Sequence, residues 1–241
     1  MQLSLMFSGS SFALPINYRP LIHGLIYRAL SADSAYSTKL HSANQNEGQN
    51  RAFKGFTFSS LQGAYTVDGR NIWFHNNVTL EIRSWDEKLI RLLEQSFRAE
   101  KTVTLGSETL PVSRVEITDA HLRESSVSVR MLTPVVAYWT DENKHTVFFQ
   151  PDEESFYTAL IRNAERKNSS FQPAVPFQLQ IHSLNDGLPK KQFSHFKKTY
   201  ITGWYGTYRL EGTPEVIDLL YQVGLGAKNS EGFGMFAVDH P

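Results

Sequence analysis

The order of strand-like and helical segments most constrains the fold, because the same order occurs in both halves of the chain. In the first half, apolar residues at helical spacing predict helices at 21–30 and from Trp85 to about Ala99. Strands are predicted before, between and after these helices, at 2–7, in the last part of 51–59, and at 71–83, 103–105 and 110–117. This order of strand, helix, two strands, helix and strands is the split βαβ pattern of ferredoxin-like folds.

The second half of the chain begins the pattern again. One helix is predicted to start at Pro151, which three acidic residues follow, and another at 214–223. The predicted strands of this half lie around the two helices, at 126–138, 146–149, 177–183 and 233–238. We therefore predict an α+β fold of two tandem ferredoxin-like (RRM-like) βαββαβ domains, at 1–120 and 124–241.

Charge and composition exclude several classes of protein. The 241-residue chain has 24 basic and 24 acidic side chains, so any contact with nucleic acid must be local. It has no cysteine, which excludes disulfides, a thiol nucleophile and cysteine-ligated zinc. No apolar run reaches the roughly 18 residues of a membrane span, and the N-terminus does not resemble a signal peptide. We expect a cytoplasmic protein with no membrane partner.

Basic residues are concentrated in one segment, 187–210, where no acidic residue interrupts them. Aromatic residues alternate with the lysines there, and this composition suits single-stranded or looped RNA, which needs cations for phosphates and rings for bases. A solvated hairpin whose aromatics face the core explains it equally well. The residues concerned are Lys190, Lys191, Lys197, Lys198 and Arg209, with Phe193, Phe196, Tyr200, Trp204, Tyr205 and Tyr208.

Four of the fifteen glycines lie in one short loop near the C-terminus, at Gly224, Gly226, Gly232 and Gly234. Glycine is favoured where the backbone takes positive φ or approaches a ligand closely. In phosphate-binding loops the glycines precede a helix, whereas these follow one, so a small-molecule nucleotide enzyme is disfavoured. Two interpretations stay open: a helix C-cap before a bulged strand, or a loop that lies against an anion with Lys228 as its cation.

The loop residues Val-Gly-Leu-Gly-Ala-Lys-Asn-Ser-Glu-Gly-Phe-Gly-Met-Phe resemble the C-terminal signature of the CRISPR-associated endoribonucleases that cut repeat RNA into guide RNAs. This is the sixth Cas family, within the RAMP superfamily. In that family the loop lies against bound RNA. The resemblance therefore implies that RNA is bound by the four glycines and by Lys228, Asn229 and Ser230, and the composition of 187–210 adds Lys190, Lys191, Lys197 and Lys198 as candidates.

Two segments of the first half resemble the same family. Gly-Leu-Ile-Tyr-Arg-Ala-Leu resembles its first helix and implies that Tyr27 is an active-site residue, although this tyrosine lies with His23 off the apolar stripe, which by itself predicts a surface position. Leu-His followed by Phe-Lys-Gly-Phe-Thr-Phe-Ser resembles its catalytic segment and implies roles for His41 and Lys54.

These residue types suit RNA cleavage without a metal or other cofactor. Histidine titrates near neutral pH and can move a proton, while lysine can stabilise the charge of a phosphorane formed by attack of the RNA's own 2′-hydroxyl. No sequence motif of a metal site is present. The alternative is a repeat-RNA-binding protein of the same fold that does not cut, which would not need His41.

The expected partner is CRISPR repeat RNA within the precursor of the guide RNAs. A CRISPR effector complex that receives the product and a homodimer are further partners that the sequence leaves open.

Overall fold

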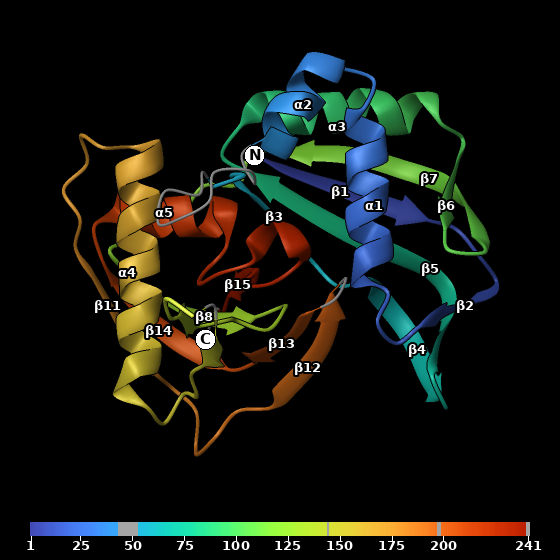
Figure 1. Ribbon diagram of the computed structural model, residues 1–241. Helices are drawn as coiled ribbons and strands as arrows, with labels where there is room; N and C mark the ends of the chain where they lie inside the picture. Colours follow the sequence, from blue (N-terminus) through green and yellow to red (C-terminus); the bar gives the residue numbers. More distant parts are fainter. Residues whose placement is uncertain (43–52, 144, 197–198, 240–241) are drawn as a thin grey trace. The chain divides into compact units, whose positions relative to one another are not determined.

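The computed structural model describes residues 1–42, 53–143, 145–196 and 199–239. The chain divides into two compact units, Met1–Ala120 and His121–Pro241, each with its own sheet and helices (Figure 1). None of the helices in the described ranges is long and apolar enough to span a membrane.

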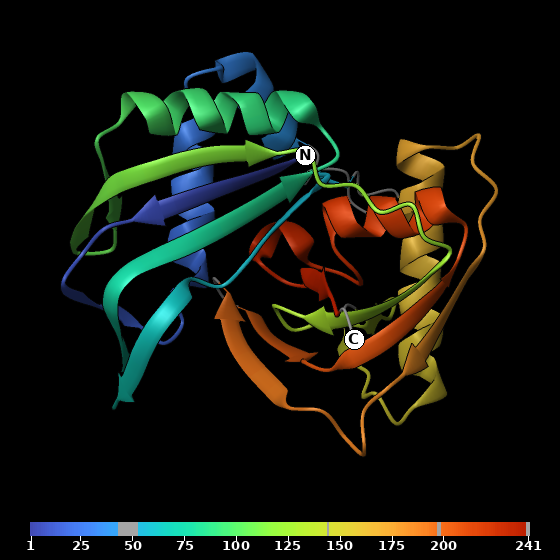
Figure 2. The ribbon, with the colours of Figure 1, turned by 180° about the vertical axis from the view of Figure 1, so that it is seen from behind.

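A seven-stranded antiparallel sheet forms the first unit, and its central strand is β1 (Gln2–Phe7). Leu3, Leu5 and Phe7 alternate on one face of β1 and are fully buried. Figure 2 shows β5, β1 and β7 side by side, and the register places Leu5 opposite both Leu80 and Val115. The other strands are β2 (Ser11–Pro15), β3 (Phe56–Phe58), β4 (Gln62–Asp68), β5 (Asn71–Ser84), β6 (Thr102–Leu105) and β7 (Glu108–Thr118).

Three helices belong to this unit: α1 (Arg19–Leu30), α2 (Ser34–Ser42) and α3 (Glu87–Ala99). Pro20 occupies the first turn of α1, where its missing N–H costs nothing, and the Asp86 side chain caps α3 by accepting from the Lys88 N–H at 2.9 Å. The apolar sides of α1 and α3 share one core with the sheet.

The second unit repeats the arrangement with a four-stranded antiparallel sheet. Its central strand β8 (Ser126–Met131) pairs with β14 (Thr207–Gly212) and β15 (Phe236–Val238), and β11 (Leu179–Ser183) lies outside β14. The helices α4 (Glu154–Phe171) and α5 (Pro214–Val223) complete the βαββαβ order (Figure 1).

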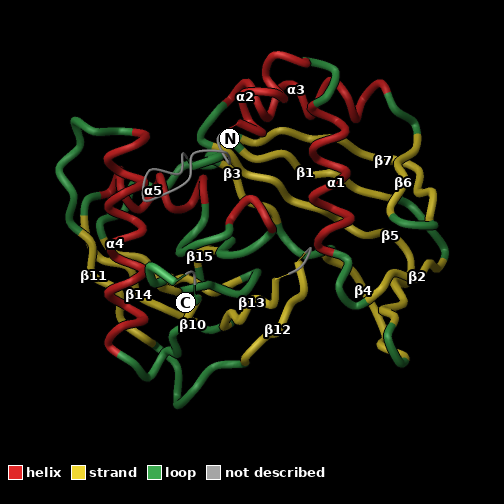
Figure 3. The backbone as a smooth tube through the Cα atoms, in the orientation of Figure 1, coloured by secondary structure: helices red, strands yellow, loops and turns green. Residues whose placement is uncertain are grey.

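Two hairpins are inserted into this order in the second unit. One is β9 (Tyr138–Thr140) with β10 (Thr146–Phe148), and the other is β12 (Lys191–Phe196) with β13 (Thr199–Trp204), which Figure 3 labels. A short 3₁₀ turn, η1 (Asn229–Glu231), lies within the glycine-rich loop.

The predicted fold class is confirmed, with differences in single elements. The strand predicted at 126–138 ends at Met131, because the N–H groups of Leu132 and Thr133 both donate to the Met235 carbonyl, outside the ladder. The last strand covers only residues 236–238 of the predicted 233–238. The segment after α1, where no helix is predicted from the sequence, contains α2, whose first turn is capped by the Asp33 side chain through the Tyr36 N–H at 2.9 Å.

Two glycines of regular elements should respond to alanine with opposite signs. A Cβ on Gly212 in β14 would collide with the Gln178 carbonyl oxygen, so we expect Gly212→Ala to destabilise the protein by about 1–3 kcal/mol. A Cβ on Gly24 in α1 meets no atom within 4 Å, so we expect Gly24→Ala to stabilise it by about 0.5–1 kcal/mol. Urea unfolding of both variants measures this, and equal effects would contradict the described pairing of β11 with β14.

Candidate functional site

Tyr27 and Lys54, which are distant in the sequence, are in direct contact in the first unit. The Lys54 ammonium donates to the Tyr27 hydroxyl oxygen at 2.5 Å, and its Nζ lies 4.8 Å from the centre of the ring. The His23 ring stacks on the Tyr27 ring with 4.4 Å between centroids. Tyr27 is therefore only 8% exposed, and the surface position suggested by the helical pattern is wrong, because His23, Lys54 and Phe56 cover that side of α1.

Hydrogen bonds of the neighbouring backbone hold Lys54 beside Tyr27. The next residue, Gly55, has φ +68°, and its carbonyl accepts from the Trp85 N–H at 3.0 Å and from the Ser84 hydroxyl at 2.8 Å. β3 then continues in register with β5, with Phe56 opposite Ser84. The position of the lysine backbone thus follows from the sheet.

His41 lies in the last turn of α2, and its side chain falls outside what the structure describes. The first turn of this helix is fastened to the first turn of α3: the Tyr36 hydroxyl donates to Asp86 Oδ2 at 2.6 Å, and Lys88 Nζ lies 2.9 Å from Asp33 Oδ2. Burial and the Asp86 carboxylate raise the pKa of Tyr36 far above its ordinary value, so this donor stays protonated. The Lys88 ammonium lowers the pKa of Asp33.

The four glycines of the C-terminal loop are all buried and all have positive φ, between +68° and +90°. A Cβ on Gly226 would lie 2.6 Å from the Val136 carbonyl oxygen, and one on Gly224 would lie 2.5 Å from Asn229 Nδ2. Gly224 also serves as the C-cap of α5. The loop's own packing therefore requires these glycines, and their contact with RNA stays a prediction.

The polar residues of the loop differ in their surroundings. Asn229 is engaged internally: its Nδ2 donates to the Leu225 carbonyl at 3.2 Å and to the Phe233 carbonyl at 3.0 Å. Lys228 and Ser230 are half-buried, and Lys228 Nζ lies 3.8 Å from Glu231 and 5.6 Å from the centre of the Tyr138 ring. The Asn229 amide is thus occupied within the loop, and contact of Lys228, Asn229 and Ser230 with RNA stays a prediction.

The sequence interpretation missed Lys167, a residue of α4 that lies beneath this loop. Its Nζ donates to the carbonyls of Gly224 and Gly226, each at 2.7 Å, and the side chain is buried. A signal was present, because Lys167 continues at helical spacing the buried stripe formed by Phe156, Leu160 and Ala164.

The hairpin β12–β13 has an outer and an inner face. Phe193 and Tyr200 on the outer face are 65% and 74% exposed, and Lys191 Nζ lies 5.0 Å from the Phe193 ring. Phe196 and Ile201 on the inner face are buried against Val136 and Phe233. Trp204 and Tyr208 are also buried. The exposed aromatics therefore fit a surface that binds RNA, and the buried ones fit a hairpin whose aromatics face the core.

The position of the four hairpin lysines is described in part. Lys190 and Lys191 are exposed, whereas Lys197 and Lys198 lie outside the described residues. Because Phe233 belongs to the glycine-rich loop, the described parts of the hairpin and the loop pack on one apolar cluster.

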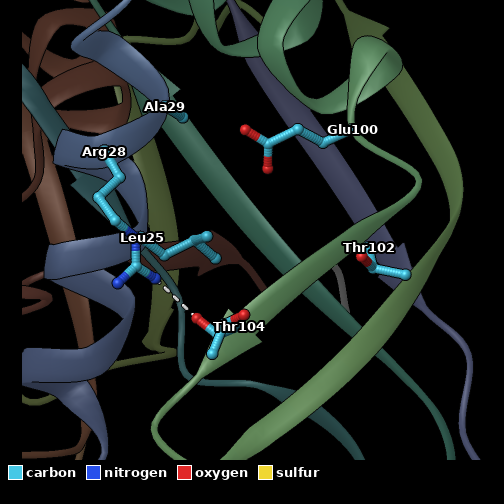
Figure 4. Close-up of a pocket in the computed structure, with 6 residues that line it drawn as sticks. All are labelled: Leu25, Arg28, Ala29, Glu100, Thr102 and Thr104. Atoms are coloured by element: carbon cyan, nitrogen blue, oxygen red, sulfur yellow. Dashed lines mark hydrogen bonds between the residues drawn. The ribbon is translucent and has the colours of Figure 1, made fainter.

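A hollow of about 400 Å³ lies beside α1 in the first unit (Figure 4). Arg28 crosses it to donate to the Thr104 carbonyl at 2.7 Å, and Glu100 faces it from the turn after α3. Its lining, as far as the chain is described, includes neither Tyr27 nor Lys54. Within the described ranges, no three histidine or carboxylate side chains group as metal ligands do.

Comparison with known proteins places the chain among CRISPR-associated proteins. The family model of CRISPR associated protein Cas6, C-terminal, matches residues 116–238. A CRISPR-associated endoribonuclease Cas6 from Pyrococcus furiosus is 21% identical over 95% of this chain and 85% of its own length. CRISPR-associated endoribonuclease Cas6 1 from Methanocaldococcus jannaschii is 23% identical over 92% of this chain and 86% of its own.

Solved structures agree on the fold. The product of a Cas6-related gene from Pyrococcus furiosus superposes with a TM-score of 0.85 at 18% identity, over 99% of this chain and 98% of that one. An RAMP protein that binds different RNA substrates superposes with a TM-score of 0.82 at 20% identity, over the whole of both chains. Because the family model covers more than half of the 241 residues, the chain belongs to the Cas6 family.

Proposed function

We propose that this protein is a metal-independent endoribonuclease that binds CRISPR repeat RNA and cuts the precursor transcript into guide RNAs. The observation that carries the proposal is the contact between Tyr27 and Lys54, two residues that the family resemblance assigns to the active site. The relatives named above as CRISPR-associated endoribonucleases support the class of reaction.

The geometry gives Tyr27 and Lys54 separate tasks. Lys54 donates to the tyrosine oxygen, so the hydroxyl hydrogen of Tyr27 points away from Nζ and can be donated to a phosphate oxygen of the RNA. The ammonium group itself stabilises the negative charge that develops on the phosphorane. A lysine held by the sheet edge and a tyrosine held on a packed helix need little reorganisation when RNA binds.

His41 moves the proton in this proposal. The 2′-oxygen upstream of the cut attacks phosphorus, the bond to the 5′-oxygen breaks, and a base and an acid respectively take the 2′-hydroxyl proton and protonate the leaving oxygen. Imidazole as a chemical group can take or give a proton near neutral pH and so suits either step. The products are a 2′,3′-cyclic phosphate and a 5′-hydroxyl.

RNA is held mainly by the second unit in this proposal. The exposed rings of Phe193 and Tyr200 can stack on bases, and Lys190 and Lys191 beside them can neutralise phosphates. Lys228 and Ser230 extend this surface into the loop. A non-cleaving binder would use the same surface, so the two functions differ at His41. Transfer of the product to an effector complex and a homodimer stay predictions.

His41→Ala should abolish cleavage and leave affinity nearly unchanged, because the imidazole moves a proton and does not anchor phosphate. With repeat RNA from the protein's own genome, we expect the single-turnover rate to fall by about 10²-fold or more. Tyr27→Phe and Lys54→Ala should slow the reaction to a smaller extent. His145→Ala, which removes an exposed histidine of the second unit, is the matched control. A His41→Ala variant that cuts at the wild-type rate would refute the assignment.

Replacing the four hairpin lysines, Lys190, Lys191, Lys197 and Lys198, by alanine should weaken RNA binding and its dependence on salt. For every lysine–phosphate contact that is removed, the slope of log affinity against log salt should decrease by about 0.7–0.9. Phe193→Ala with Tyr200→Ala should instead weaken binding at an unchanged slope, because stacking releases no counterions.

The control for this experiment removes the same charge elsewhere, with alanine at Arg91, Arg98, Lys101 and Arg114 of the first unit. It should leave the slope unchanged. If the hairpin substitutions and the control substitutions reduce the salt slope equally, the hairpin lysines contribute only to net charge and the hairpin is not the binding surface.

A further inference from the structure

A single buried ammonium group connects the first glycine pair of the glycine-rich loop with Asn229 in the middle of the loop. Lys167 is 1% exposed, and its Nζ donates to the carbonyls of Gly224 and Gly226 and to Asn229 Oδ1, the last at 2.8 Å. Gly224 caps α5, so its carbonyl lies at the negative end of that helix. The Lys167 ammonium therefore offsets the negative partial charge at the C-terminus of α5, and it also binds the loop that follows this helix.

The three described oxygen acceptors suit the charged form of the side chain. An ammonium group has three N–H donors, whereas a neutral amine has two and would leave one of these oxygens without its donor. Burial acts in the opposite direction and lowers the pKa of Lys167 to about 7. The hydrogen bonds that the charged form donates oppose this desolvation and favour the ammonium form.

Lys167 also decides which way the Asn229 amide faces. Because the ammonium can only donate, the amide oxygen of Asn229 must face Nζ, and its NH₂ group then points at the carbonyls of Leu225 and Phe233. These two carbonyls lie within the first and the second glycine pair. One asparagine, oriented by one lysine, thus joins the two halves of the loop.

We propose that Lys167 is the positioning residue of the RNA-binding loop, which fixes Asn229 and the backbone of residues 224–234 so that Lys228 and Ser230 are presented to repeat RNA. This inference rests on the proposed function. It assigns Asn229 to loop geometry, together with Lys167, in place of direct contact with RNA.

Lys167→Met tests the proposal, since it keeps an unbranched side chain and removes the three donors. Hydrogen exchange of the protein without RNA should become at least about tenfold faster at the amides of 224–234, because the loop loses hydrogen bonds from a charged donor, which are stronger than neutral ones. The Kd for repeat RNA should rise by about tenfold or more for the same reason. The single-turnover rate at saturating RNA should stay near the wild-type rate.

Asn168→Ala is the matched control, because Asn168 is a buried polar neighbour on α4 whose described hydrogen bonds, to the Val175 carbonyl and from Gln172, lie outside the loop. It should lower stability without changing loop exchange or Kd. If Lys167→Met fails to fold, Asn229→Ala removes the same connection from the loop side, and we expect the same faster exchange and weaker binding.

Unchanged exchange at 224–234 in a folded Lys167→Met protein would overturn the proposal, as would a Kd shift that Asn168→Ala reproduces. A different result would show that the proposed function is wrong. A wild-type protein that binds no repeat RNA refutes that function, while the exchange measurement still decides whether Lys167 holds the loop.

Discussion

The order of the C-terminal loop depends on the hydrogen bonds between the buried Lys167 ammonium and the loop oxygens. An unsatisfied buried carbonyl costs about 1–3 kcal/mol, so each of these acceptors needs its donor. The consequence reaches beyond the loop, because Phe233 lies between two of its glycines and packs against Phe196 and Ile201 of the β12–β13 hairpin. The surface proposed to bind RNA is therefore built on one polar and one apolar cluster.

The first unit positions its chemistry in a different way. Tyr27 is carried by α1, which is held by buried apolar contacts, and Lys54 precedes a strand that pairs within the sheet. The helix that carries His41 is attached at its first turn through polar contacts, of which the hydrogen bond from Tyr36 to Asp86 is the shortest. Leu40, the residue before His41, is 8% exposed and belongs to the apolar core of this unit, so α2 is also held near its end.

Hydrophobic periodicity was sufficient to predict the fold class and most of its helices and strands, because each element buries one regular face. It could not predict where β8 ends. The N–H groups of Leu132 and Thr133 donate to the carbonyl of Met235, about one hundred residues later, and so do not continue the strand pairing. Nor could it predict that Tyr27 is buried, because Lys54 and Phe56, which cover it, come from another segment. At the loop, local rules indicate that glycines adopt positive φ, but the Cβ contacts that exclude other residues are made by Val136 and Asn229. A charged residue on an apolar helical stripe is the local sign of a site such as that of Lys167.

The measurement that tests the proposed reaction most directly is end-group analysis of the cleaved RNA, combined with a substrate carrying one 2′-deoxy nucleotide just upstream of the scissile phosphate. We predict a 2′,3′-cyclic phosphate and a 5′-hydroxyl in excess EDTA, and a deoxy RNA that binds and competes but is not cut. A 3′-hydroxyl with a 5′-phosphate, or activity that disappears with EDTA and is restored by Mg²⁺, would contradict an active site made of protein groups alone.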